Sequence, residues 1–367
     1  MTYVLIMQRS DLLRVGIAFH EKYKQYDFGP GHPFRGDRFT NALKCFEEQG
    51  LLNLPHVQIL KPNIAKLKDL LRVHNKSYVD LIFDFAEKGR PYDLDTPLST
   101  RILEGALHIM GGALKIGESL YDGKIERGIS LGGGLHHAGE DFGGGFCIFN
   151  DVAILTRYLQ QERAVKRVLI LDYDVHAGNG TSDIFYSDPS VLFISIHQDP
   201  KTLFPGTGFT SQIGRGEGEG FNVNVPLPPG TGNETYFFAL KEVFIPLTRE
   251  FKPDIILANG GSDPHFADIL GSLGLTVSGF FDLSRLIIET ANEACSRRTI
   301  LLVGSGYNPT VLPSCWYALA AGVSEVEEIK VNDPSAPPVE PPWCRQRVKA
   351  TISELRRNLR NHWKCFR

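Results

Sequence analysis

The sequence lacks both an excess of charge of one sign and a long hydrophobic run. Among 367 residues, 39 are basic and 42 acidic, so the formal net charge is only −3. This balance excludes a strongly basic nucleic-acid-binding protein, and a hydrophobic content of 42% excludes a disordered chain. No apolar run is long enough to cross a bilayer, so we expect neither membrane nor nucleic acid among its partners.

Cysteine is also sparse, and none of it is paired along the sequence. The six cysteines include no Cys-x-x-Cys pair, which excludes a zinc ribbon and a dense disulfide framework. This usage indicates a reducing compartment. The opening residues 1–11 carry an apolar stretch of only five residues with no basic residue before it. They predict a first strand and not a signal peptide, and we therefore expect a cytoplasmic protein.

Continuous apolar runs that end in small or polar residues recur along the chain and alternate with helical patterns. Such runs are typical of strands buried on both faces, and the alternation predicts an α/β protein with a parallel sheet covered by helices on both sides. Ligands then bind beyond the carboxyl ends of the strands. The predicted strands are 168–174, 191–197, 255–261 and 300–306, and the predicted helices are 150–159, 234–250 and 283–294.

The segment 333–343, DPSAPPVEPPW, is the best candidate for a linker. After it, Val348, Ile352, Leu355, Leu359 and Trp363 recur at helical spacing, and such a stripe needs a surface to pack against. We therefore predict one domain over residues 1–367, with a proline-rich surface crossing at 333–343 and a C-terminal helical segment, 344–367, packed on it. We interpret the opposite, basic face of that helix as solvated: Arg345, Arg347, Lys349, Arg356, Arg357 and Arg360.

The densest chemical signal is Asp172-Tyr-Asp174-Val-His176, directly after a buried strand. Side chains alternate on a strand, so these three residues share a face, where they would repel and desolvate one another unless a cation held them. The alternative is three separately solvated groups at a loop mouth. Asp263 follows another strand in the matching place and supplies a further oxygen ligand. An Asp/His/Asp set leaves open positions, as catalytic zinc sites do.

Two aspartates already neutralise Zn²⁺, so water at such a site needs a base to take its proton. The tandem His136-His137, set among glycines after a short strand, is the candidate, although a lone histidine is more often structural. Tyr307, in Gly-Ser-Gly-Tyr-Asn (304–308), is placed to donate a hydrogen bond to a developing oxyanion. Taken alone, this tyrosine would be an ordinary turn residue.

Together these motifs resemble the histone deacetylase superfamily of zinc-dependent deacetylases, from about residue 16 to residue 320. YDFGPGHPFRGDRF (26–39) resembles the acetoin-utilisation branch most closely, whereas GEGFNVNVPLPPGTG (218–232) is shared more widely. The resemblance implies an arginase/deacetylase-like α/β fold with a mostly parallel sheet of about eight strands.

The resemblance also implies roles for the site residues. Asp174, His176 and Asp263 match zinc ligands, His137 the general base and acid, His136 its electrostatic partner, and Tyr307 the oxyanion donor. Asp172 matches the aspartate that orients His136 and that joins Ser195 in a monovalent-cation site, commonly potassium. Two departures stand out: Asn179 replaces an aspartate found behind the second histidine in many members, and Ala177 replaces a frequent histidine.

Substrate-binding positions follow from the same resemblance. Gly145 and Phe146, together with Phe204, match the walls of an acyl-lysine tunnel, and apolar walls suit the neutral stem of an acylated lysine. Asp95 matches a rim aspartate that binds substrate backbone, and Arg38 matches a residue near an internal acetate channel. Leu270 falls where polyamine specialists can carry a gatekeeper glutamate.

We therefore expect a zinc-dependent hydrolase that removes acetyl or other acyl groups from lysine side chains. An acetylpolyamine or other small acyl-amide hydrolase is the first alternative, although Leu270 disfavours polyamines. A catalytically silent acetyl-lysine-binding subunit and an arginase-like dinuclear hydrolase are the others, the latter with too few extra carboxylates. The sequence leaves the oligomeric state and the preferred acyl length open.

Overall fold

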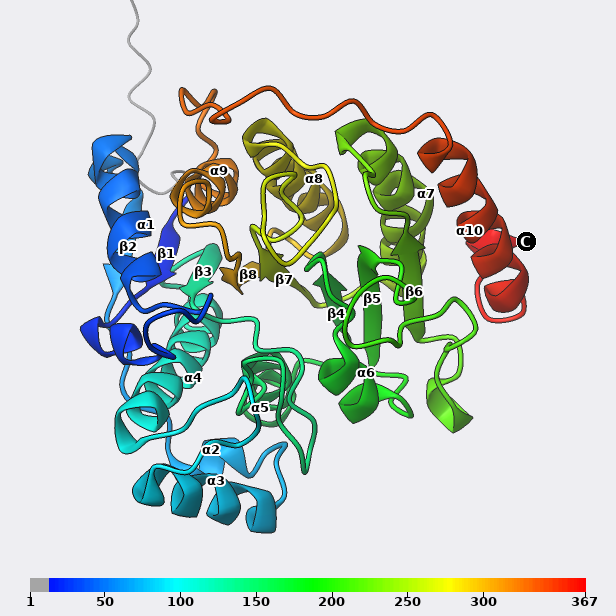
Figure 1. Ribbon diagram of the computed structural model, residues 1–367. Coiled ribbons are helices and arrows are strands. Elements are labelled where there is room, and N and C mark those ends of the chain that lie inside the picture. The colour runs from blue at the N-terminus through cyan, green and yellow to red at the C-terminus, as the bar shows by residue number, and fades with distance from the viewer. Residues whose placement is uncertain (1–12) are drawn as a thin grey trace, which may run out of the picture.

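The computed structural model describes residues 13–367, in which eight strands form one sheet (Figure 1). The predicted strand in residues 1–11 lies outside the described residues. The order across the sheet is β2-β1-β3-β8-β7-β4-β5-β6, and every neighbouring pair is parallel. The predicted parallel α/β architecture is thus confirmed. The strands are β1 (Val15–Ala18), β2 (Val57–Leu60), β3 (Arg127–Leu131), β4 (Val168–Asp172), β5 (Val191–Gln198), β6 (Asn222–Leu227), β7 (Ile255–Gly261) and β8 (Thr299–Ser305).

Helices cover both faces of the sheet, as strands buried on both sides require. In Figure 1, α1, α7, α8 and α9 lie above the sheet, and α4, α5 and α6 lie below it. The predicted helices 150–159, 234–250 and 283–294 correspond to α5, α7 and α8. The ends of α7 agree to within a residue, whereas α5 continues four residues further and α8 begins six residues earlier than predicted. The bounds are α1 (Asp37–Glu48), α2 (Leu67–Leu70), α3 (Lys76–Lys88), α4 (Thr100–Tyr121), α5 (Asp151–Arg163), α6 (Asn179–Phe185), α7 (Asn233–Phe251), α8 (Val277–Ala294), α9 (Leu312–Val323) and α10 (Cys344–Leu359).

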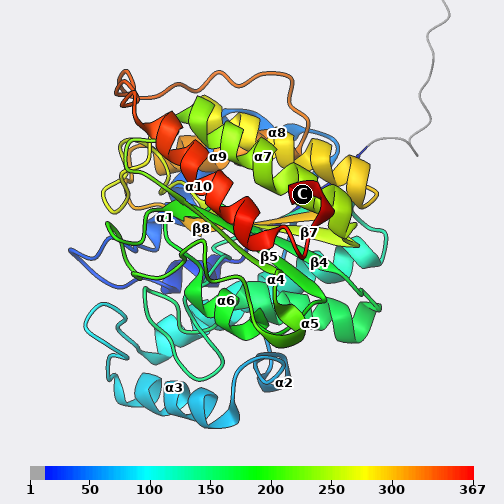
Figure 2. The same ribbon diagram turned by 90° about the vertical axis from the view of Figure 1, so that its right-hand side faces the viewer.

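Helix α10 lies beside α7, near the edge strand β6 (Figures 1 and 2). Its apolar stripe, Val348, Ile352, Leu355 and Leu359, is buried, and the indole N–H of Trp363 donates to the Gly220 carbonyl at 2.7 Å. The helix thus protects a sheet edge. On the predicted solvated face, Arg347, Lys349, Arg357 and Arg360 are exposed, whereas Arg345 and Arg356 are partly buried. Arg345 lies 3.6 Å from the Phe238 ring centroid, and Arg356 pairs with Glu242 at 2.5 Å.

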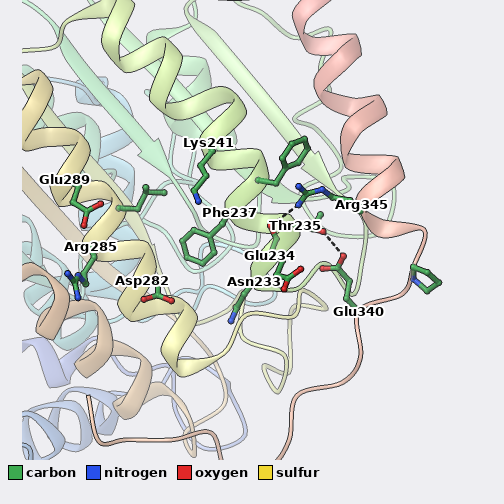
Figure 3. A pocket seen from close by; sticks show the side chains of 13 residues that line it. Asn233, Glu234, Thr235, Phe237, Lys241, Asp282, Arg285, Glu289, Glu340 and Arg345 are labelled. Carbon is green, nitrogen blue, oxygen red and sulfur yellow. Dashed lines mark hydrogen bonds between the residues drawn. The ribbon is translucent and has the colours of Figure 1, made fainter. Parts of the chain in front are cut away.

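The proline-rich crossing 333–343 binds the beginnings of two helices through its carboxylates. Asp333 accepts from the backbone N–H of Val277, the first residue of α8, at 3.0 Å, and from Nε2 of His265 at 2.7 Å. Glu340 accepts from the N–H of Gly232 at 2.7 Å and from Oγ1 of Thr235 at 2.6 Å, at the start of α7 (Figure 3). Negative charge favours these helix ends. The nearby groove between α7 and α8, about 950 Å³, contains no predicted site residue.

No helix of residues 13–367 is long and apolar enough to cross a membrane. The apolar interior instead gathers on the two faces of the sheet.

Buried His74 supports the loop that leads from β3 to α5. Its Nδ1 donates to the Gly139 carbonyl at 2.8 Å and its Nε2 accepts from the N–H of Asn150 at 3.0 Å, so the ring is neutral. Burial lowers the pKa of His74 to about 4 from 6.5. The unfolded chain therefore takes up this proton at higher pH than the folded one, and the stabilisation is present above pH 6.5 and lost as pH falls towards 4.

His74→Gln removes this titration while keeping a donor and an acceptor. We expect the difference in unfolding free energy between wild type and variant to shrink by about 2 kcal/mol between pH 7 and pH 5, because only the wild type loses the His74 contribution. Urea titrations at both pH values measure it. A difference that does not change with pH would contradict the assignment.

Candidate functional site

The predicted site residues come together at the carboxyl edge of the four central strands. His136 and His137 follow β3, Tyr307 follows β8, Asp263 follows β7, and Asp172 ends β4. These strands are consecutive in the sheet, in the order β3-β8-β7-β4. Because all are parallel, their carboxyl ends lie at one edge and deliver residues far apart in sequence to one place.

Asp174, His176 and Asp263 form a cluster with the donor set of a metal site. All three are buried, and one ligand atom of each lies within 4.8 Å of the others. Nδ1 of His176 is 3.0 Å from Oδ1 of Asp174 and 3.3 Å from Oδ2 of Asp263. That Oδ2 is buried and receives no hydrogen bond from the described residues. A buried, unsatisfied carboxylate oxygen facing an imidazole fits a bound cation.

The electrostatics of the cluster point the same way. Burial, and next the Asp174 carboxylate, raise the pKa of Asp263 to about 8. Burial opposes protonation of His176, but the hydrogen bond to Asp174 and the charges of Asp174 and Asp263 outweigh it and raise the pKa of His176 to about 10. The three side chains therefore attract positive charge between them, which a divalent cation satisfies better than protons.

The two histidines form a relay that ends on different partners. Nδ1 of His136 is 2.7 Å from Oδ2 of Asp172, and Nδ1 of His137 is 2.7 Å from Oδ1 of Asn179. An amide oxygen only accepts, so Nδ1–H of His137 donates and its Nε2 keeps a lone pair. The two Nε2 atoms are 3.1 Å apart. His137 is thus oriented to receive a proton on Nε2.

Different partners separate the pKa values of the two rings. Burial disfavours the cation of His136, but the Asp172 and Asp174 carboxylates outweigh it and raise the pKa to about 9. Burial, and then the neighbouring His136 and His176, hold the pKa of His137 well below its usual range. At neutral pH, His136 is the charged ring and His137 the neutral one, the arrangement that a base requires.

Backbone geometry holds this relay in place. A Cβ on Gly178 would lie 2.2 Å from Oδ2 of Asp172, so only glycine allows this approach. Asp151, at the start of α5, accepts from the N–H groups of Gly134 at 2.9 Å and Leu135 at 2.8 Å, just before the histidines. Asp151 was not among the site residues predicted from the sequence. Its only signal is an acid directly after the glycine-rich loop, where a helix begins.

Tyr307 faces the cluster from the other side. Its ring centroid is 6.5 Å from that of His176 and 5.6 Å from that of Phe146. Its backbone N–H donates to Oδ2 of Asp268 at 2.7 Å, a buried carboxylate that the sequence analysis also missed. In the sequence, Asp268 looks like one more polar residue of a turn.

Phe204 and Phe146, the two predicted substrate-wall residues, lie next to His137 and Tyr307, respectively. The Phe204 ring centroid is 5.0 Å from that of His137. Phe204 is 54% exposed, so it lies where the site opens to solvent. Phe146 has a φ of 69°, and the Tyr26 hydroxyl donates to its carbonyl. A Cβ on Gly145 would lie 2.5 Å from Cδ2 of His137, so glycine lets this loop approach the base.

The remaining predicted substrate residues lie around this centre. The Asp95 carbonyl accepts from Nε2 of His32 at 3.0 Å, and the His32 ring is 4.7 Å from Phe146, so Asp95 is near the rim. Arg38 is buried, donates to the carbonyls of Gly304 at 2.8 Å and Pro33 at 3.1 Å, and lies 5.6 Å from the Tyr307 ring. Leu270 lines a cavity of about 460 Å³ together with Arg38 and Tyr307.

Asp172 and Ser195, the predicted potassium ligands, are register partners on β4 and β5. Oγ of Ser195 donates to Nδ1 of His197 at 2.8 Å, and Nε2 of that ring donates to the Gly208 carbonyl at 2.9 Å. The serine oxygen keeps its lone pairs. The strand ladder therefore brings two oxygen-bearing side chains next to each other at the buried end of the relay.

Removal of one carboxylate tests the metal cluster. Asp263→Asn should weaken Zn²⁺ binding at least about tenfold, because a neutral amide replaces one of only three protein ligands. Calorimetric zinc titration of the metal-stripped protein measures it. Asp254→Asn, at the other end of β7, is the matched control and should bind zinc as the wild type does. Equal affinity in both variants would show that the site is misassigned.

Comparisons with known proteins agree with this geometry. Residues 32–323 match the histone deacetylase domain family. A probable deacetylase of Archaeoglobus fulgidus is 34% identical over 96% of this chain and 99% of its own length. The acetoin utilization protein AcuC of Staphylococcus aureus is 35% identical over 83% of this chain and 80% of its own. The crystal structure of the HDA15 HD domain shares the fold, with a TM-score of 0.83 at 24% identity, over 96% of this chain and 97% of its own. The chain therefore belongs to the histone deacetylase family and resembles its AcuC-type members.

Proposed function

We propose that this protein is a zinc-dependent hydrolase that removes acetyl or other acyl groups from lysine side chains. The observation that carries the proposal is the convergence of three features at one strand edge: a buried Asp/His/Asp cluster, a neutral histidine with a lone pair on Nε2, and a tyrosine. Zn²⁺ held by Asp174, His176 and Asp263 would supply Lewis acidity, polarising the substrate carbonyl and making water more acidic.

The chain's own residues supply the proton transfers in this proposal. Nε2 of His137 takes the proton of the attacking water, and the same nitrogen later delivers a proton to the leaving lysine amine. His136, charged and paired with Asp172, stabilises the negative charge that develops nearby. The Tyr307 hydroxyl donates to the oxygen of the tetrahedral intermediate. Phe146 and Phe204 exclude water around the neutral acyl-lysine stem.

Substrate choice rests on the groups around this centre. Leu270 offers no carboxylate to a distant ammonium, which favours acyl-lysine in proteins over acetylpolyamines. Asp95 is suited to accept from the backbone N–H of a bound peptide.

We also propose K⁺ at Asp172 and Ser195, a single catalytic domain over residues 1–367, and a cytoplasmic location. Turnover of an acetyl-lysine peptide separates the enzyme from a silent acetyl-lysine-binding subunit, which would bind without turnover.

Tyr307→Phe should lower kcat on an acetyl-lysine peptide by about 10²- to 10³-fold, since it removes one oxyanion donor. Zinc content and the thermal unfolding temperature should stay close to wild type, because the ring packing is kept. Steady-state kinetics with metal analysis measures both. An unchanged kcat would place this phenol outside the chemistry.

Asn179→Asp tests the base. A carboxylate at 2.7 Å from Nδ1 stabilises the His137 cation more than the amide does, and so raises the pKa of His137. The acidic limb of the profile of kcat/KM against pH should therefore move to higher pH. Profiles of both proteins at fixed zinc and potassium concentrations measure the shift. A limb that moves to lower pH, or not at all, would mean that His137 is not the titrating base.

A further inference from the structure

Two loops at the carboxyl edge are joined by a buried carboxylate that the mechanism does not use. Asp268 lies on the loop after β7 and is 8% exposed. Oδ2 accepts from the N–H of Tyr307 at 2.7 Å and of Asn308 at 3.3 Å, and Oδ1 accepts from the N–H of Leu270 at 2.9 Å. All three neighbours are donors, which suits an ionised carboxylate.

The contact between the loops is reciprocal. Nδ2 of Asn308 donates to the Ala267 carbonyl at 2.6 Å, next to Asp268. The segments 267–270 and 307–308 are thus bound in both directions, through one side chain of each loop. A lost bond would leave polar groups that are buried or partly buried without a partner, so the two segments are costly to separate.

The backbone of Tyr307 needs such support. Gly306, just before it, has a φ of 117°, and a Cβ there would lie 1.8 Å from Oγ of Ser262, so this position requires glycine. Up to Ser305 the chain is held by the β8 ladder and by the Trp316 indole, which donates to the Ser305 carbonyl at 3.0 Å. Past Gly306, the next fixed points are the two N–H groups on Asp268.

The Tyr307 side chain is held by packing and, among the described residues, not by a hydrogen bond of its own. Within the described part of the chain, its hydroxyl forms no hydrogen bond, and the ring is held by packing against neighbours such as Phe146 and Arg38. A hydroxyl without a protein partner is available to substrate, but its position then depends on the backbone that carries it. A misplacement of about 1 Å can lower a rate about 10²-fold.

We infer that Asp268 is the positioning residue of Tyr307: its carboxylate fixes the backbone from which the phenol reaches the substrate carbonyl, and the same carboxylate holds Leu270 beside it. This inference rests on the proposed function, since it acts through the hydroxyl of Tyr307. One buried side chain thus fixes the position of the loop that carries Tyr307 relative to the loop that carries Asp263.

A double-mutant cycle on the zinc-loaded protein tests the inference. In Asp268→Asn, an amide NH₂ must face a backbone N–H, so the loop relaxes. We expect kcat on an acetyl-lysine peptide to fall at least about tenfold, with KM within about twofold. In a Tyr307→Phe background, the same change should lower kcat by less than about twofold, because the hydroxyl through which Asp268 acts is already gone.

Asp254→Asn is the matched control. Oδ2 of Asp254 also accepts from two consecutive backbone N–H groups, of Lys166 and Arg167, both at 2.8 Å, but at the opposite end of β7. This variant should keep kcat within about twofold of wild type. Hydrogen exchange gives a readout besides activity: the peptide 305–311 should exchange faster in Asp268→Asn and unchanged in Asp254→Asn.

Equal losses of kcat from Asp268→Asn in the wild-type and Tyr307→Phe backgrounds would overturn the inference, as would a matching loss of zinc. Failure of the proposed function is distinguishable, because the wild type would then not turn over the acetyl-lysine peptide, or Tyr307→Phe alone would leave kcat unchanged. If Asp268→Asn does not fold, Asn308→Ala keeps Asp268 and removes the reciprocal bond to Ala267, together with the bond that Oδ1 of Asn308 accepts from the N–H of Thr310 at 3.0 Å. Its kcat should fall in the wild-type background and not in Tyr307→Phe, and a loss in both backgrounds, or in neither, would overturn the inference.

Discussion

The burial of three carboxylates at the ends of two adjacent strands is the constraint on which this structure depends. Asp172, Asp174 and Asp263 are at most 2% exposed. Buried anions of like sign are stable only with positive or hydrogen-bonding partners. His136 pairs with Asp172, and His176 lies between Asp174 and Asp263. The parallel sheet makes this possible because it delivers β4 and β7 side by side with the same polarity.

The loops around these groups are held by other carboxylates that bind backbone N–H groups. Asp151 fixes the turn before the histidines, and Asp268 binds the backbone of Tyr307. Such bonds hold irregular chain without a ladder or a helix, and in a buried site they also satisfy N–H groups that would otherwise be unpaired. Rigid strands thus set the distances between groups, and buried acids set the local orientation of the loops.

Membership of the histone deacetylase family places these features in context without erasing what is particular to this chain. The relatives named above share between 34% and 35% identity with it, and the HDA15 HD domain, at 24%, shares the fold. Asn179, which is hydrogen-bonded to His137, is one feature that bears on the chemistry of this chain. An amide orients the ring as an aspartate would, yet adds no charge, so His137 stays neutral between two more basic rings.

The sequence by itself determined the buried strands and the main chemical groups. Long apolar runs predict β4, β5, β7 and β8, because strands buried on both faces need apolar side chains throughout. Asp174, His176 and the tandem histidines stand out because such groups rarely follow a buried strand without a partner. The resemblance to a family extended this to the potassium ligands, the tunnel walls and the rim, which remain proposals.

Only the tertiary structure decided the rest. β1 and β2 have four residues each, and β2 is a half-exposed edge, so neither has a pattern that separates it from a loop. Asp151 and Asp268 resemble ordinary turn residues in the sequence. An aspartate that binds solvent-exposed backbone and one that binds a buried loop cannot be told apart there. Arg345 and Arg356 likewise pack on α7 where the helical pattern alone shows a solvated face. In each case the deciding contact joins residues far apart in sequence, and no local pattern records it.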